Sequence, residues 1–209
     1  MNKRLPFYAL WLIFPLLAVF VVTKSAYFFG LSTPAMVVNF LLRVIGLAAL
    51  PLLAWQIFLG AYMEKMASRF GGWVAKYHFQ QGIIIGTLIF MHPVMLFVER
   101  YLSLHILDPF YVFTDVCLLC QNKRDLFLTA GRFGFWLIVM GIIAGKIREW
   151  EWWKENWRYF HWLNYLGFLV IFFHGFKLGT DFHSVFYLPV AYFSLGLVLI
   201  SVIKRLLGR

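Results

Sequence analysis

The sequence predicts an all-α protein, a polytopic membrane protein built as a six-helix transmembrane bundle. Composition is the first reason, because 62% of the 209 residues are hydrophobic and only 13% are charged. A soluble domain carries roughly 45–50% apolar and about 25% charged residues, so this chain has too little polar surface for water. The second reason is that the apolar residues fall in long stretches. We therefore expect a single transmembrane domain over residues 1–209, surrounded by lipid.

Six stretches have about the 20 mostly apolar residues that a membrane-spanning helix needs. They are Leu5–Val22, Met36–Tyr62, Trp73–Val98, Phe127–Gly145, Trp157–Phe176 and Val185–Ile203. The first follows Lys3 and Arg4, as in a signal peptide, but its apolar run exceeds the usual h-region and no A-x-A-type cleavage site follows. It is predicted to be an uncleaved helix. Pro15, Pro51 and Pro93 fall inside helices, where neighbouring helices in a membrane can satisfy the freed carbonyls.

The lysines and arginines predict the orientation of these helices. The chain has 19 lysines and arginines, of which Arg43 and Arg132 lie inside or at the ends of helices. Of the others, twelve lie in connecting segments or ends of the chain on the same side of the membrane as the N-terminus, and five lie in segments on the opposite side. Cytoplasmic loops carry such an excess, so both termini are expected in the cytoplasm, in a bacterial inner membrane. The same excess explains the net charge of +10 without a nucleic-acid partner.

Four of the six histidines lie within predicted helices, His78 and His92 on the third and His161 and His174 on the fifth. Ionisable side chains inside spanning segments are costly, and they mark functional sites by default. A lone histidine would be explained by a hydrogen bond between helices, whereas two pairs on two helices indicate a shared function. Both helices start at the cytoplasmic side. His78 and His161 are therefore expected near the inner surface, and His92 and His174 near the outer one.

The spacing of the histidines places them at two levels. His78 and His92 are 14 residues apart, which is about 21 Å of helix rise and about 40° from a shared face. His161 and His174 are 13 residues apart, which is about 19.5 Å of rise but about 220° around an ideal helix. The fifth helix is therefore expected to be overwound or bent near Gly167, or to present its two histidines to different sides.

Two imidazoles at each of two levels favour two b-type haems. Haem iron accepts axial nitrogen ligands, and the flat apolar macrocycle fits between the helices of a bundle. Zinc would need three or four clustered ligands, with cysteine or carboxylate among them, and no such cluster is present at either depth. A proton relay is an alternative, but relays usually include intramembrane aspartate or glutamate. Here all nine acidic residues lie in loops or at helix ends.

The chain resembles the ferric reductase-like transmembrane domain, the haem-binding membrane domain shared by ferric reductases and NADPH oxidases. The resemblance covers all six helices and is most specific in two stretches, KYHFQQGIIIGTLIFMHP and WRYFHWLNYLGFLVIFFHGFKLGTD. Members of the family carry paired histidines on these two helices with the same two spacings. The resemblance implies that His78 and His161 ligate an inner haem and that His92 and His174 ligate an outer one. It implies an oxidoreductase that passes electrons from the cytoplasmic side to an outer acceptor such as ferric chelate or oxygen.

Arg43 lies inside the second predicted helix, where an arginine is costly unless an anion pairs with it. It stands seven residues past the outer start of that helix, so roughly 10 Å deep, and His92 lies at a similar depth. Oxidases of the family also have an arginine in this helix. The expected partner is a propionate of the outer haem, and the alternative is a side chain that snorkels to the outer interface.

The sequence departs from the family in two ways. We expect no flavin- or nicotinamide-binding domain within residues 1–209, because only six residues follow the sixth helix and no G-x-G-x-x-G motif lies between a strand and a helix. A separate flavin reductase, a quinone or a domain outside these residues is therefore expected as the electron donor. Oxidases also carry a further histidine one turn beyond the outer ligand of the third helix, where this chain has Leu96. This difference argues against dedicated superoxide production.

Two other functions stay open on the sequence. A haem membrane subunit that feeds a periplasmic methionine sulfoxide reductase matches the chain in size and in the fifth-helix histidines. Its third helix, however, usually has one matching histidine rather than two. A non-redox helical transporter or assembly factor would use the four histidines for packing alone.

The outer loops hold further candidate groups. Cys117 and Cys120 are expected to form a structural disulfide or to stay as thiols, and a redox-active pair is the alternative. Five other polar loop residues could form a weak ferric-ion site or have no function. They are His105, Asp108, Asp115, Asp181 and His183.

Overall fold

The computed structural model of the protein describes residues 3–25 and 33–207, and these ranges contain helices and no strand. The all-α prediction is therefore confirmed. The helices are α1 (Leu5–Lys24), α2 (Pro34–Ala61), α3 (Met63–Phe70), α4 (Trp73–Leu104), α5 (Tyr111–Thr114), α6 (Lys123–Lys146), α7 (Trp153–His161), α8 (Leu163–Leu178) and α9 (Leu188–Leu207). Five of them, α1, α2, α4, α6 and α9, are long and apolar enough to cross a membrane.

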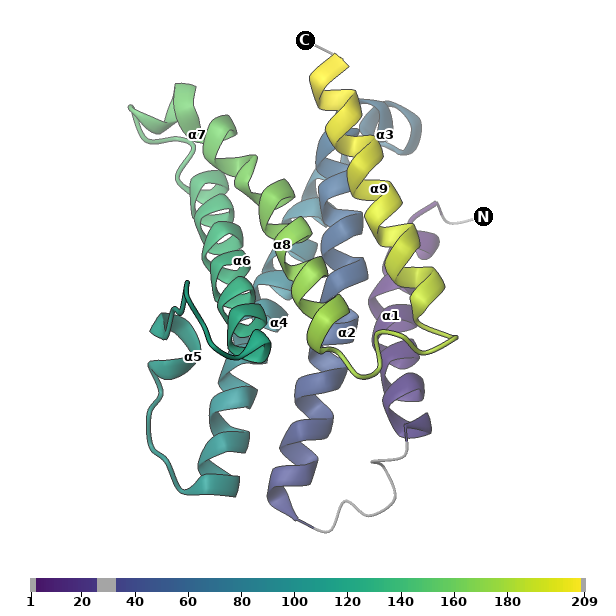
Figure 1. The fold of residues 1–209 in the computed structure, drawn as a ribbon. Helices are drawn as coiled ribbons and strands as arrows, with labels where there is room; N and C mark the ends of the chain where they lie inside the picture. The colour runs from purple at the N-terminus through teal and green to yellow at the C-terminus, as the bar shows by residue number, and fades with distance from the viewer. Residues whose placement is uncertain (1–2, 26–32, 208–209) are drawn as a thin grey trace.

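Six helices, α1, α2, α4, α6, α8 and α9, alternate in direction along the chain (Figure 1). The short helices α3 and α7 lie at the same end of the bundle as the C-terminal end of α9, whereas α5 lies toward the opposite end (Figure 1). In the interior, α2 packs along α4, and α6 packs along α8. These two helix pairs, α2 with α4 and α6 with α8, position the candidate site.

The centre of α2 is the most buried part of the bundle. Every residue from Leu47 to Ala54 is buried, because α1, α4 and α9 all pack against this helix. A helix that is apolar on all sides belongs in such an interior position. Buried tyrosines add polar links between neighbouring segments. Tyr187 Oη donates a hydrogen bond to the carbonyl of Leu47 at 2.8 Å, and Tyr77 Oη donates to the carbonyl of Phe7 at 2.7 Å.

The helix α4 extends beyond its predicted end at Val98. It continues to Leu104 and ends at His105, whose φ of 56° is left-handed. Glu99 and Arg100 end the apolar run in the sequence, but both are good helix formers, so the backbone stays helical past the apolar segment. The carboxyl-terminal part of α4 therefore carries polar residues into the same end of the bundle as α5.

The fifth predicted helix is interrupted, at Trp162 rather than near Gly167. The helix α7 ends at His161, and α8 begins at Leu163 with only 16 residues. The N–H of Tyr165 donates to the carbonyl of Trp162 at 3.0 Å, a bond to the third residue back that marks a tighter 3₁₀-type turn. The overwound turn at Trp162 thus separates α7, which ends at His161, from α8, which carries His174.

Glycines allow α6 and α8 to pack with their backbones almost in contact. A Cβ atom added to Gly134 would lie 3.4 Å from the carbonyl oxygen of Gly167, and one added to Gly167 would lie 3.3 Å from the carbonyl oxygen of Gly134. Small residues at such positions are typical of closely packed helices in membrane proteins. This close approach holds α8 in a fixed register on α6.

Candidate functional site

The four intrahelical histidines lie on three helices. His78 and His92 are on α4, His161 is the last residue of α7, and His174 is on α8. All four are half-buried. We call His92 and His174 the outer pair and His78 and His161 the inner pair, after the predicted orientation.

The two rings of the outer pair, one from α4 and one from α8, lie in edge contact. The ring centroids of His92 and His174 are 6.4 Å apart, and the rings are perpendicular at 90°. An imidazole nitrogen lies about 2.0–2.1 Å from a bound metal ion and about 1.1 Å from its own ring centre, so two rings on opposite sides of one ion have centres about 6.3 Å apart. The outer pair therefore has the separation that axial ligands of one haem iron require.

The inner pair comes from two different helices. His78 lies near the start of α4, and His161 is the last residue of α7. Within residues 3–25 and 33–207, no group of three or more His, Cys, Asp or Glu side chains could hold a metal ion. The donor set at each level is thus two imidazoles, which fits the axial positions of a haem better than a zinc site.

Each histidine of the outer pair rests against a glycine of the neighbouring helix. A Cβ atom on Gly46 of α2 would lie 2.8 Å from Cε1 of His92, and one on Gly131 of α6 would lie 2.6 Å from Nδ1 of His174. Separations below 3.0 Å are essentially never seen for a Cβ atom. Only glycine leaves these two imidazoles the space they occupy.

The inner pair repeats this arrangement. A Cβ atom on Gly60 would lie 3.2 Å from Cε1 of His78, and one on Gly145 would lie 3.3 Å from Nδ1 of His161. Sequence reasoning missed all four glycines. A signal was present, because Gly46 and Gly60 on α2, and Gly131 and Gly145 on α6, are each 14 residues apart. That spacing equals the one between His78 and His92.

The glycines also expose backbone carbonyls to the imidazoles. Nδ1 of His92 lies 3.1 Å from the carbonyl oxygen of Leu42, and Nδ1 of His174 lies 2.8 Å from that of Phe127. Nδ1 of His161 lies 3.0 Å from the carbonyl oxygen of Gly141. A carbonyl oxygen only accepts hydrogen bonds, so each Nδ1 carries the proton. The other ring nitrogen, Nε2, is then the one with a lone pair for a metal ion.

The three carbonyls share one place in the helix. Each belongs to the residue four positions before the glycine that its histidine touches. In an α-helix this carbonyl already accepts the N–H of that glycine. Because the glycine has no side chain, the imidazole reaches the second lone pair of the same oxygen. The same hydrogen bond, from Nδ1 to a backbone carbonyl four residues before a glycine, therefore fixes the ring orientation of three histidines.

His78 departs from this pattern. The residue four before Gly60 is Gln56, and its side-chain nitrogen lies 3.4 Å from Nε2 of His78 and donates to the carbonyl of His78 at 2.9 Å. Nδ1 of His78 is buried and has no hydrogen-bond partner among the described residues. A buried imidazole nitrogen without a partner is costly.

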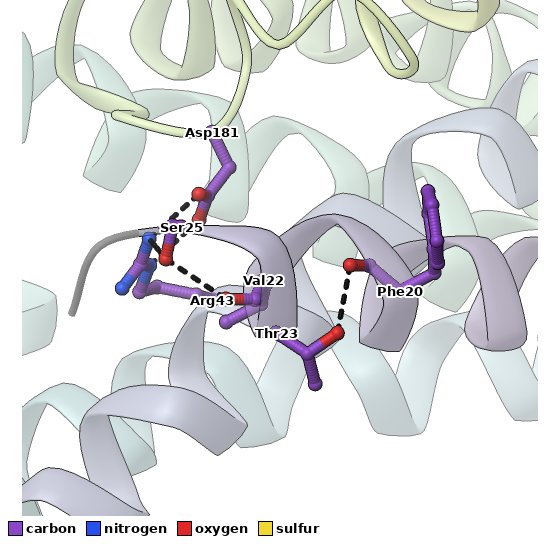
Figure 2. Close-up of polar contacts among 6 residues, drawn as sticks. All are labelled: Phe20, Val22, Thr23, Ser25, Arg43 and Asp181. Carbon is purple, nitrogen blue, oxygen red and sulfur yellow. Dashed lines mark hydrogen bonds and ion pairs between the residues drawn. The ribbon is translucent and has the colours of Figure 1, made fainter. Parts of the chain in front are cut away.

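Arg43 has a carboxylate partner within the protein. Its Nε and Nη2 atoms donate to the two carboxylate oxygens of Asp181, both at 2.6 Å, and Nη2 also donates to Ser25 Oγ at 2.9 Å (Figure 2). Asp181 lies between α8 and α9 and is only 6% exposed. Bidentate pairing of this kind is among the stronger ion-pair geometries. The contact of Arg43 with a haem propionate stays a prediction.

Replacing Asp181 with Asn is expected to destabilise the fold without removing a histidine ligand. The change leaves Arg43 largely buried beside a neutral side chain, which costs about 3–5 kcal/mol. At this chain length the loss lowers the unfolding midpoint by roughly 10 °C. Thermal unfolding of the detergent-solubilised protein measures the shift. The exposed Glu149→Gln variant is the control, and equal midpoints for the two variants would show that the ion pair contributes no stability.

A polar cavity of about 520 Å³ opens at the end of the bundle that carries α3 and α7. Its charged lining consists of three basic and two acidic side chains, Arg158, Lys204, Arg205, Glu64 and Glu155. The lining also includes Gly60, which touches His78, and Trp162, which follows His161. The cavity therefore lies next to residues that adjoin the inner pair, and its volume lies within the usual range of about 300–1,000 Å³ for ligand pockets.

The outer-loop candidates fall into different roles. Cys117 and Cys120 form a disulfide, and the N–H of Cys117 donates to Thr129 Oγ1 of α6 at 3.1 Å. Asp181 is occupied by Arg43 and faces the interior, so it is not an exposed metal ligand. The described residues contain no assembled ferric-ion site of three or more such groups.

Comparison of the chain with protein-family models, with curated proteins and with solved structures gives no match. The class of site is therefore defined by its geometry alone. It consists of four histidines in a helical bundle, with His92 and His174 in ring contact and each of the four rings lying against a glycine.

Proposed function

We propose that this protein is a di-haem b transmembrane electron-transfer protein of the ferric reductase-like type. Its function is to pass electrons from a donor on the cytoplasmic side to an outer acceptor such as ferric chelate or oxygen. The observation that carries the proposal is the outer pair, whose ring centres are 6.4 Å apart while a glycine and a backbone carbonyl lie against each ring.

The residues of the chain supply position and proton placement. His78 and His161 would hold the inner haem, and His92 and His174 the outer one. When bound, each haem supplies an iron that alternates between the ferric and ferrous states and carries one electron at a time. The carbonyls of Leu42, Phe127 and Gly141 keep the proton on Nδ1, so that a neutral imidazole presents Nε2. Hydrogen bonds of this kind also make the imidazole a stronger ligand.

The donor side is assigned to the end with the polar cavity. Arg158, Lys204 and Arg205 outnumber the two acidic side chains in its lining, which favours an anionic donor. Lys204 and Arg205 also donate hydrogen bonds to the carbonyls of Ala61 and Gly60 at the end of α2. A separate flavin reductase or a quinone is the proposed partner, docked next to the inner pair.

The proposed topology has six crossings, with both termini in the cytoplasm of a bacterial cell. Five crossings correspond to α1, α2, α4, α6 and α9. The remaining crossing combines α7 and α8, which follow one another across the break at Trp162. The alternating direction of these helices supports an even number of crossings, which puts both ends of the chain on one side.

Expression with an ample haem supply is expected to give a red protein with two haem b per chain. The reduced-minus-oxidised absorption spectrum should be that of low-spin haem with two histidine ligands, because imidazoles flank each iron on both sides. Haem extracted by acid acetone, divided by the protein concentration, gives the stoichiometry. A colourless preparation of folded protein would reject the proposal in favour of a non-redox role.

A further inference from the structure

Two arginines gather around one tyrosine beside the outer pair. The guanidinium carbon of Arg100, near the end of α4, lies 4.0 Å from the centre of the Tyr111 ring. The guanidinium carbon of Arg132, on α6, lies 4.9 Å from the same centre. Tyr111 is the first residue of α5, so the loop after α4 brings its ring between two helices. Cation–π contacts of this kind hold both guanidinium groups in place.

These two cations have too few anions around them. Arg132 is only 6% exposed, and its nearest carboxylate is that of Asp115 at 3.5 Å, which is itself 59% exposed. Among the described residues, no carboxylate lies at ion-pairing distance from Arg100, and its Nε is buried without a hydrogen-bond partner. A buried guanidinium is stable only when paired and hydrogen-bonded. The group of Arg100, Arg132 and Tyr111, which we call the arginine cluster, therefore has one carboxylate, the exposed one of Asp115, for two guanidinium groups.

The arginine cluster borders the proposed outer haem site. Arg132 directly follows Gly131, the glycine against which His174 rests. Arg100 lies two turns beyond His92 on α4. Arg43, by contrast, already has both of its carboxylate contacts in Asp181. The least satisfied positive charge at this level of the bundle is thus on Arg100, next to Arg132, whose single carboxylate partner is exposed.

We propose that the arginine cluster is a carboxylate-binding site at the outer haem level. Guanidinium groups form the planar, bidentate contacts that suit a carboxylate, and Nε of Arg100 is one of the donors. The proposal rests on the proposed function, because the carboxylate comes either from a propionate of the outer haem or from the chelator of an acceptor such as ferric citrate. Either ligand would complete the ion pairing of Arg100 and of the buried Arg132.

The test replaces each arginine with glutamine and measures the midpoint potentials of the two haems by spectroscopic redox titration, with no added carboxylate. If the ligand is a propionate, Arg132→Gln and Arg100→Gln lower the potential of the outer haem alone. Removing a nearby positive charge disfavours the added electron, and we expect at least a tenfold drop in the equilibrium constant for reduction, which is about 59 mV for one electron. Arg124→Gln, an exposed change on the first turn of α6, is the matched control and should leave both potentials unchanged.

A second arm identifies the source of the carboxylate. Reoxidation of the reduced protein is followed with ferric citrate and with hexaammineruthenium(III), an acceptor that has no carboxylate. If the cluster binds the chelator, reoxidation by ferric citrate slows at least fivefold more than reoxidation by the ruthenium complex. If it binds a propionate, the variants change reoxidation by the two acceptors to the same extent.

Potentials and reoxidation rates equal to those of Arg124→Gln in both variants would overturn the carboxylate site. Arg100 is only half-buried, so its replacement disturbs the fold less. If Arg132→Gln does not fold, the measurements on Arg100→Gln alone test the proposal. Failure of the proposed function is recognised separately, because the unaltered protein would then contain no haem to titrate.

Discussion

Replacing His92 with Ala is expected to remove one of the two haems and to leave the other. The substitution deletes one of two axial ligands at the outer level and changes nothing at the inner level, about 21 Å away along α4. The remaining ligand, His174, keeps its hydrogen bond to the carbonyl of Phe127 but has no partner on the opposite side. Haem content and the reduced-minus-oxidised spectrum of purified protein measure the result, with half the haem of the unaltered chain expected.

His78→Ala is the mirror experiment, and the haem that remains should be the one that His92→Ala removes. The two singly loaded proteins should differ in midpoint potential, because the outer level adjoins the arginine cluster and the inner level opens to the polar cavity. His105→Asn is the control, since His105 lies outside both pairs and its left-handed φ of 56° is tolerated by asparagine. Retention of both haems by the folded His92→Ala protein would contradict the assignment of ligands to levels.

The features that depend on residues close together in the sequence, such as apolar runs and histidine spacing, were predictable. Apolar runs long enough to cross a membrane gave the principal helices, and the intervals between His78 and His92 and between His161 and His174 gave the two-level hypothesis. The conflict between 13 residues and an ideal helix also anticipated an irregularity, although the structure places it at Trp162 and not at Gly167. Neither Trp162 nor its neighbours include a proline or glycine that would mark the break, so its position depends on packing.

The features that depend on distant segments were not predictable in the same way. Arg43 and Asp181 are separated by 138 residues, and nothing near either residue indicates the other. The arginine cluster likewise joins the end of α4, the start of α5 and the middle of α6. The glycines that touch the histidines lie on α2 and α6, the helices that pack along α4 and α8. Their 14-residue spacing was visible, but its meaning required knowing which helices pair.

The glycine contacts lead to the second large effect that we expect. Gly131→Ala and Gly46→Ala should weaken binding of the outer haem by 10–100-fold, the range typical when a group that orients a metal ligand is lost. The new methyl group at position 131 would stand 2.6 Å from Nδ1 of His174, and the one at position 46 would stand 2.8 Å from Cε1 of His92. Each imidazole must move away, and in moving it loses the carbonyl that fixes its proton on Nδ1.

This loss cannot be attributed to a weaker helix, because alanine favours the helix over glycine by about 1 kcal/mol. Gly196→Ala on α9 is the matched control, since a Cβ atom there has no heavy atom within 4 Å. At the inner level, Gly60→Ala and Gly145→Ala place the methyl group at 3.2 and 3.3 Å from the imidazole, and a smaller loss of the inner haem is expected. Competition for haem by apomyoglobin measures all five proteins. Gly131→Ala and Gly46→Ala could instead bind haem as tightly as Gly196→Ala does. In that case the glycines serve helix packing alone, and the orientation of His92 and His174 does not depend on them.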